Sequence, residues 1–301
     1  MTDPVLRAPR ESDAEAIVSC FRVAFGDDRH VDAEEILRWL ASTDLRLKVA
    51  ETGGRIVGFA DLVHNPANDE LEMCIAAHGF ERAFLDWAER SARAEGIGST
   101  RAFFPAGHPL ENIVRTRGYT YWNSSLTMHI ELEDAEPPPA RVPGDLTVRA
   151  YEPDDEIELR AALNEVFVDD PFFQEATETT FREWYLDSHA FDPAHWHLAW
   201  DGEALAGFAL AFAGRPGDPG LGHVSSLGVR TGWRRRGLGE ALLRTAFAGL
   251  HRAGLRRIEL GVVADNTTGA VRLYERVGMR ATQRWDNWVG TVPRGDCPPS
   301  D

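Results

Sequence analysis

The residues best suited to chemistry lie at 222–250, where a strand pattern, a basic loop and an amphipathic helix follow one another. The first N–H groups of a helix have no internal partner and carry partial positive charge. Glycines let the backbone reach positive φ and approach a phosphate closely, and arginines add forked donors. The sequence therefore predicts a phosphate-binding junction at the loop residues, which are Arg234, Arg235, Arg236, Gly237, Leu238 and Gly239.

The strand before this loop carries side chains that could act on a substrate. Regular alternation predicts one shared face for every second residue, namely His223, Ser225, Leu227 and Val229. A neutral imidazole at His223 could accept a proton near pH 7. Ser225 could bind a substrate or relay a proton. The alternative is that His223 is an ordinary surface residue of the strand.

The spacing Arg234-x-x-Gly237-x-Gly239 directly after a strand resembles the acyl-CoA-binding motif of the GNAT (Gcn5-related) N-acetyltransferases. The resemblance implies acetyl-CoA as the cofactor. His195 and His197 have no third ligand at a short spacing, so no metal is expected. The resemblance also implies that the strand splays from its neighbour and offers free backbone groups to the pantetheine arm. The residues implied in cofactor binding are Leu227, Gly228, Val229, Arg234, Arg235, Arg236, Gly237, Leu238, Gly239, Glu240, Asn266 and Tyr274.

A GNAT reaction needs a base for the attacking amine, donors for the oxyanion and an acid for the leaving thiolate. Tyr274, four residues before Gly278, resembles the tyrosine that the family directs at the CoA sulfur. The alternative is a core tyrosine. The candidate base is His223, and Glu259 is the second candidate because strand alternation turns it away from its apolar neighbours.

The resemblance implies an acceptor site lined by two segments, 166–173 and 284–288. Three carboxylates there could hold a cationic amine, and the aromatic residues could form apolar or cation–π walls. Solvated loop carboxylates and core aromatics are the alternative. The candidates from these segments are Asp169, Asp170, Phe173, Trp285 and Asp286.

An internal repeat organises the chain. Residues 6–13 match 148–155, residues 54–60 match 202–209, and residues 111–119 match 271–279. The order of these matches predicts two copies of one α/β fold (α+β in some schemes). The resemblance implies two tandem GNAT folds, each a mixed, mostly antiparallel twisted sheet flanked by helices.

The two copies differ where chemistry is expected. The first lacks an Arg-x-x-Gly-x-Gly loop and has Val114 where the second has Tyr274. We therefore expect a degenerate, non-catalytic domain over 1–133, a proline-rich linker over 134–145 and a catalytic domain over 146–295. Residues 296–301 are expected to form a disordered tail.

Composition narrows the classes of partner. The net charge of −16 disfavours nucleic acid and permits cationic small molecules. No apolar run approaches the roughly 20 residues of a membrane span, and the N-terminus lacks signal-peptide features. Cys20, Cys74 and Cys297 form no pair at redox or metal spacing, which favours reduced thiols in the cytoplasm.

The expected function is acetyl transfer from acetyl-CoA to the primary amine of a small molecule, by a monomer or homodimer. A protein N-terminal or lysine acetyltransferase is one alternative, and it predicts an open groove instead of a closed pocket. The intact loop and the charge disfavour an aminoacyl-tRNA-dependent transferase. His223 and Tyr274 together disfavour a CoA-binding protein without catalysis.

Overall fold

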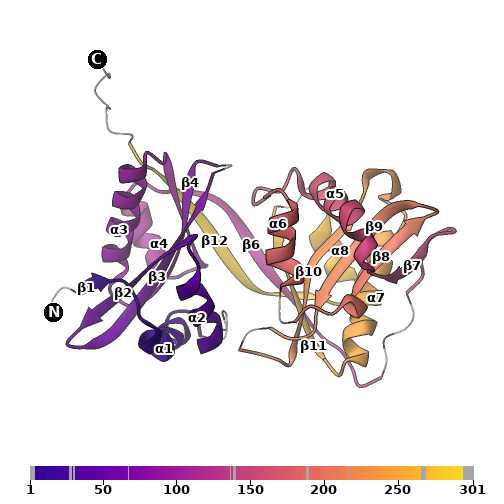
Figure 1. Cartoon of the computed structure of the whole chain (residues 1–301), viewed down its shortest axis with the longest axis horizontal. Coiled ribbons are helices and arrows are strands. Elements are labelled where there is room, and N and C mark those ends of the chain that lie inside the picture. Colours follow the sequence, from indigo (N-terminus) through magenta and orange to yellow (C-terminus); the bar gives the residue numbers. More distant parts are fainter. Residues whose placement is uncertain are drawn as a thin grey trace, which may run out of the picture. The chain divides into compact units, whose positions relative to one another are not determined.

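The computed structural model describes residues 4–26, 29, 31–66, 68–135, 137, 140–187, 190–215, 217–265 and 269–293. The chain forms two compact units (Figure 1). Unit 1 comprises Met1–Leu126, Val263–Asp265 and Gln283–Asp301. Unit 2 comprises Thr127–Val262 and Asn266–Thr282. Among the described residues, no helix combines the length and apolar character that a membrane crossing requires.

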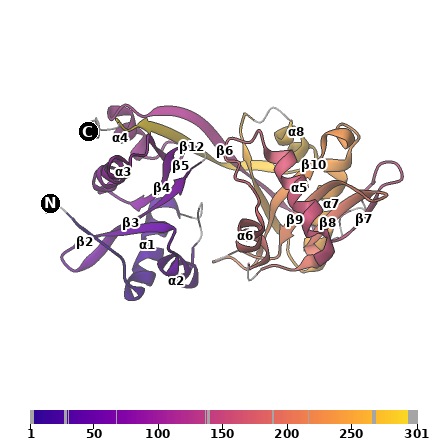
Figure 2. The ribbon, with the colours of Figure 1, turned by 45° about the horizontal axis from the view of Figure 1, so that its top comes forward.

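Unit 1 is a twisted sheet with helices on both sides (Figures 1 and 2). Its strands are hydrogen-bonded in the order β1-β2-β3-β4-β5-β12-β6. The β4–β5 pair is parallel, while β1–β2, β2–β3, β3–β4 and β5–β12 are antiparallel. The elements are β1 (Val5–Arg7), α1 (Ala14–Phe25), α2 (Ala33–Ala41), β2 (Leu45–Thr52), β3 (Arg55–Asn65), β4 (Glu70–Ala77), α3 (Glu81–Glu95), β5 (Ser99–Pro105), α4 (Leu110–Thr116), β6 (Thr120–Glu131) and β12 (Arg280–Thr291).

Unit 2 repeats this plan with the strand order β6-β11-β10-β9-β8-β7. Helices α5 and α6 pack through Leu159, Leu163 and Phe181 on the sheet face that carries Phe208. Helix α7 covers the other face. The elements are β7 (Thr147–Ala150), α5 (Glu156–Phe167), α6 (Glu178–Phe181), a π-helical turn (Arg182–Leu186), β8 (Trp196–Asp201), β9 (Ala204–Phe212), β10 (Leu221–Val229), α7 (Leu238–Arg252), β11 (Arg257–Val263) and α8 (Ala270–Arg276).

The internal repeat is visible in matching ion pairs. In unit 1, Arg7 donates to both carboxylate oxygens of Asp13, at 2.7 and 3.1 Å. In unit 2, Arg149 makes the same forked contact with Asp155, at 2.6 Å to each oxygen. Each carboxylate also accepts a backbone N–H at the start of its helix. The sequence match therefore reflects a repeated local structure.

The unit boundaries differ from the expected ranges of 1–133 and 146–295. Strand β12 pairs with β5 from Trp285↔Pro105 to Thr291↔Ser99, so residues 283–291 of β12 belong to unit 1. Residues 127–131 of β6 belong to unit 2. The physical reason is that β6 and β12 each span 12 residues and contribute to both units. The described linker residues, 134, 135, 137 and 140–145, form no helix or strand, and the expected tail at 296–301 lies outside the described residues.

Candidate active site

The arginine loop has the backbone geometry of an anion-binding site. Gly237 has a φ of +87° at the N-cap of α7, and Arg235 has a φ of +63°. Left-handed residues beside extended or helical ones turn successive N–H groups toward a common point. Arg235 and Arg236 are exposed, and the Nε of Arg234 donates to the Val229 carbonyl at 2.8 Å. The loop thus presents free cationic side chains at the positive end of a 15-residue helix.

The turn is shorter than expected from the Gly-Leu-Gly sequence. Helix α7 already begins at Leu238, so Gly239 lies within its first turn. A Cβ on Gly239 would meet the Leu273 side chain at 3.3 Å and Val229 at 3.6 Å. Gly239 therefore serves close packing against α8 and β10. Glu240, in the same turn, is paired with Arg244 at 2.9 Å.

The two parallel strands at the centre of unit 2 separate as expected. Strands β10 and β11 pair only from Leu221↔Arg257 to His223↔Glu259. Beyond this rung, β10 continues to Val229 and β11 to Val263 without further described pairing between them. Backbone groups of β10 at 224–229 therefore face an opening, and Leu227, Gly228 and Val229 lie beside the arginine loop. A slot with free backbone donors and acceptors suits an extended amide-containing chain.

A β-bulge changes which residues of β10 share a face. The register shifts between Val224 and Ser226, so Ser225 is an extra residue. His223 pairs with Phe212 and Ser226 with Leu210, two positions apart on β9. His223 therefore lies on the face of Ser226 and Gly228. The expectation that His223, Ser225, Leu227 and Val229 share one face is wrong, because it assumed uninterrupted pairing.

The two candidate bases stand opposite each other on the last paired rung. The Nδ1 of His223 lies 4.0 Å from Oε1 of Glu259. That carboxylate is already bonded to the guanidinium of Arg215. Burial, with a further contribution from Arg215, lowers the pKa of His223 to about 3. The imidazole is therefore neutral at pH 7, but in this arrangement it is a weak base.

Tyr274 lies on the short helix α8 and is buried, with 7% of its surface exposed. Burial raises the pKa of its phenol to about 12. The group therefore stays protonated at neutral pH and can donate a hydrogen bond. Asn266, the expected pantetheine ligand, lies outside the described residues.

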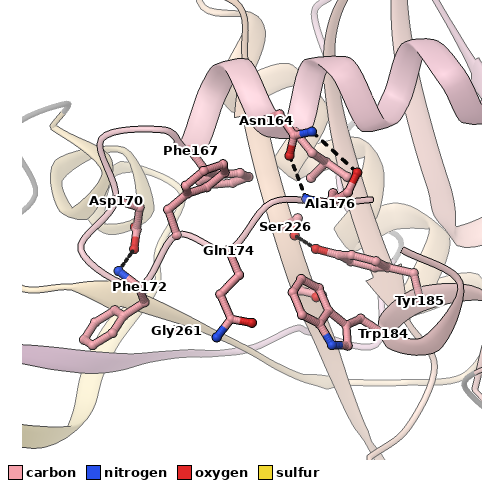
Figure 3. Close-up of a pocket in the computed structure, with 13 residues that line it drawn as sticks. Asn164, Phe167, Asp170, Phe172, Gln174, Ala176, Trp184, Tyr185, Ser226 and Gly261 are labelled. Carbon is pink, nitrogen blue, oxygen red and sulfur yellow. Dashed lines mark hydrogen bonds between the residues drawn. The ribbon is translucent and has the colours of Figure 1, made fainter. Parts of the chain in front are cut away.

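A cavity of about 350 Å³ opens on the Ser226 face of the sheet (Figure 3). Its floor includes Ser225, Ser226 and Gly261, from the two strands that separate. Its walls come from α5, the loop after α5 and the π-helical turn. The wall residues are Leu163, Asn164, Phe167, Asp170, Phe172, Phe173, Gln174, Ala176, Trp184 and Tyr185.

The π-helical turn brings Tyr185 and Trp184 into this cavity. The phenol of Tyr185 lies 3.0 Å from the Ser226 hydroxyl (Figure 3). Burial raises the pKa of Tyr185, and hydrogen bonds with Ser226 and Ser225 partly offset that effect. Trp184 remains 44% exposed. Turns of this kind are frequent at functional sites because the extra residue redirects side chains.

The cavity includes part of the expected acceptor site. Asp170, Phe173 and Ser225 line it, whereas Asp169 does not. Trp285 and Asp286 belong to unit 1, because residues 283–291 of β12 join that unit and 285–291 pair with β5. There, Trp285 packs on Phe25 and Phe103, and buried Asp286 accepts hydrogen bonds from Ser124 and Arg284. Sequence reasoning missed Asn164, Gln174, Trp184 and Tyr185, and the adjacent Trp-Tyr pair was the available signal.

The start of α3 in unit 1 differs from the matching start of α7 in unit 2. The carboxylate of Glu81, at the start of α3, accepts the N–H of Gly79 at 3.1 Å and is buried. A negative side chain therefore occupies the helix terminus that a phosphate would need. Val114, fully buried, takes the place of Tyr274. Among the described residues of the chain, no group of three His, Cys, Asp or Glu side chains could hold a metal ion.

The chain is similar to known acetyltransferases in sequence and in fold. The model of the acetyltransferase (GNAT) family matches residues 158–279. A mycothiol acetyltransferase from Salinispora tropica is 30% identical over 298 residues, covering 94% of this chain and 93% of the relative. A GCN5-related N-acetyltransferase from Sphaerobacter thermophilus superposes with a TM-score of 0.81 at 27% identity, over 97% of each chain.

A tandem GNAT protein from the clavulanic acid biosynthesis pathway superposes with a TM-score of 0.72. It covers 98% of this chain and 99% of its own, and its 15% identity shows the fold alone. The chain belongs to the GNAT family of acetyltransferases. It is an acyltransferase built from two tandem GNAT folds, and in this it resembles mycothiol synthase.

Proposed function

We propose that the chain transfers an acetyl group from acetyl-CoA to the primary amine of a small molecule, by direct attack on the thioester in a ternary complex. The opening between β10 and β11 carries this proposal, since it runs beside the arginine loop and shares Ser225, Ser226 and Gly261 with the cavity. A cofactor held in the opening would present its thioester to an acceptor held in the cavity. All of these groups belong to unit 2, so catalysis is assigned there.

Each part of acetyl-CoA has a matching feature. The N–H groups at the start of α7, with Arg235 and Arg236, would bind the pyrophosphate. The backbone groups of 227–229 that face the opening, on the side away from β9, would bind the pantetheine amides. A β10 N–H could stabilise the oxyanion, and the neutral phenol of Tyr274 would donate to the leaving thiolate.

The cavity supports an amine with an apolar or aromatic body as the acceptor. Five of its wall residues are aromatic, one is a carboxylate (Asp170), and no Arg, Lys or His is among its lining residues. A bound carboxylate or phosphate would thus lose water without gaining a cationic partner. An ammonium group would meet Asp170 and the aromatic rings. The volume of about 350 Å³ suits a small molecule and supports this reading over a protein substrate.

We assign unit 1 no catalysis, because Glu81 and Val114 replace the anion site and the acid. The 30% identity to a mycothiol acetyltransferase over 94% of the chain supports a second candidate, namely that relative's own reaction. We further propose that the protein is cytoplasmic, that it is a monomer or a homodimer, and that it binds neither nucleic acid nor membrane. The net charge of −16 supports the exclusion of nucleic acid.

An amine panel tests the acceptor class. Thiol release with mass detection would compare phenethylamine, phenylalanine, glucosamine and an acceptor of the mycothiol acetyltransferases. We expect phenethylamine to be acetylated at least tenfold faster than phenylalanine, which adds only a carboxylate. Trp184→Ala should raise KM for phenethylamine, and Val168→Ala, an exposed residue of the same segment outside the cavity lining, should not. Equal rates for the two matched amines would contradict the assignment.

A further inference from the structure

The side chains of His223 and Glu259 face each other across β10 and β11 but are not hydrogen-bonded. Their rung is the last paired one before β10 and β11 separate. The bulge aligns His223 with Ser226, and alternation aligns Glu259 with Gly261, so both lie on the sheet face that carries the cavity, next to its lining residues. The Nδ1 of His223 is buried without a hydrogen-bond partner among the described residues. Its distance of 4.0 Å from Oε1 of Glu259 is too long for a hydrogen bond.

Glu259 does not reach His223 because it is bonded elsewhere. The same oxygen, Oε1, accepts from the guanidinium of Arg215, in the turn between β9 and β10. The Glu259 side chain is 13% exposed and the Arg215 side chain 44%, so the cation lies on the solvent side of the carboxylate. A buried, unpartnered polar nitrogen is costly, and a shift of roughly 1 Å would complete its bond.

We propose that Arg215 is a positioning residue that holds Glu259 away from His223, and that opening of the Arg215–Glu259 ion pair joins His223 and Glu259 into the base of the reaction. The role of the joined His223–Glu259 pair as the base rests on the proposed function. In the joined state, Glu259 accepts the Nδ1–H of His223 and leaves Nε2 as the proton acceptor. The ammonium of the acceptor gives one proton to Nε2, which yields a neutral amine and an imidazolium that the carboxylate stabilises.

The charges around His223 agree with this role. Glu259 faces it from β11 and Arg215 from the turn, whereas β9 contributes only the uncharged Phe212. The phenol of Tyr185 lies on the same face, bonded to Ser226. With Arg215 in place, burial and, to a smaller extent, the nearby cation both lower the pKa of His223. Release of Arg215 removes one of these effects and frees a carboxylate that acts in the opposite direction.

Histidine NMR titration of the full chain tests this directly, with His223→Gln used to assign the signal. We expect His223 of the wild type to show no titration between pH 5 and 8. In Arg215→Gln its pKa should rise by at least two units into that range. Arg257→Gln is the matched control, because it breaks the Arg257–Asp218 contact of 2.8 Å to the same turn. That control should leave His223 unchanged.

The double variant Arg215→Gln/Glu259→Gln shows whether a rise in the pKa of His223 comes from loss of the Arg215 charge or from the freed Glu259 carboxylate. If Glu259 completes the pair, the double variant should lose most of the rise seen in Arg215→Gln. An unchanged titration in Arg215→Gln, or an equal rise in the double variant, would overturn the proposal. The titration needs no substrate, so it stands apart from the amine assay. A raised pKa without acetylation of any amine would refute the proposed function and leave the positioning role intact.

Discussion

Replacement of Gly237 by valine separates the anion site from the stability of α7. Gly237 has a φ of +87°, and nothing lies within 4 Å of a Cβ built there. The Cβ therefore meets no steric clash, but an L-residue in this region is strained by about 1–2 kcal/mol. Gly254, just beyond the end of the same helix, has a φ of +90° and equally open surroundings. Gly254→Val should carry the same strain without touching the loop.

The two variants should thus lose similar stability and differ in CoA binding. Hydrogen bonds to charged groups contribute roughly 1.5–3 kcal/mol each, and 1.4 kcal/mol is a factor of ten. Loss of one phosphate contact through a displaced or obstructed loop should weaken CoA binding by about 10- to 100-fold in Gly237→Val. Calorimetric titration with CoA would measure this, alongside thermal melts without ligand. Equal CoA affinities for the two variants would refute the anion-site reasoning.

Two further predictions concern buried titratable groups. Tyr274→Phe should lower kcat by roughly 10²–10⁴-fold with little change in CoA affinity. The control variant Tyr151→Phe, which changes another buried tyrosine, should not lower kcat. Normal turnover by Tyr274→Phe would show that the Tyr274 phenol takes no part in the mechanism. Burial lowers the pKa of His197 to about 4, so this side chain stays neutral in the fold below pH 6.5 while the unfolded chain takes up a proton. The free energy of unfolding of the wild type therefore falls as the pH drops from 6.5 toward 4. Urea unfolding at pH 6.5 and pH 5 should show that this fall is smaller in His197→Gln than in the wild type, by about 2 kcal/mol. An equal loss in both proteins would contradict the neutral buried state.

The sequence predicted features that depend on local chemistry. The repeat follows from residues that build one capped helix start, seen twice as Arg7–Asp13 and Arg149–Asp155. The arginine loop was predictable from Gly237 and from the helix pattern that begins directly after it. The separation of β10 from β11 came with the family resemblance. The repeat and the arginine loop need only short stretches of sequence, and the structure confirms their local geometry.

Features that depend on distant pairing were not predictable. The bulge at Ser225 has no sequence signal here, and it moves His223 to the other face of β10. Residues 285–291 of β12 join unit 1 because they pair with β5, more than 170 residues earlier. This pairing removed Trp285 from the expected acceptor site. Arg215 is likewise brought to Glu259 only by the tertiary fold.

The fate of the acetyl group in a single turnover tests the central claim most directly. Excess enzyme would be loaded with acetyl-CoA, mixed rapidly with phenethylamine and followed by mass spectrometry and thiol release. The account predicts that N-acetylated amine and free CoA form at one rate, in equal amounts, without acetylated protein. An acetyl-enzyme formed before the product, or thiol release with acetate and no acetylated amine, would contradict it.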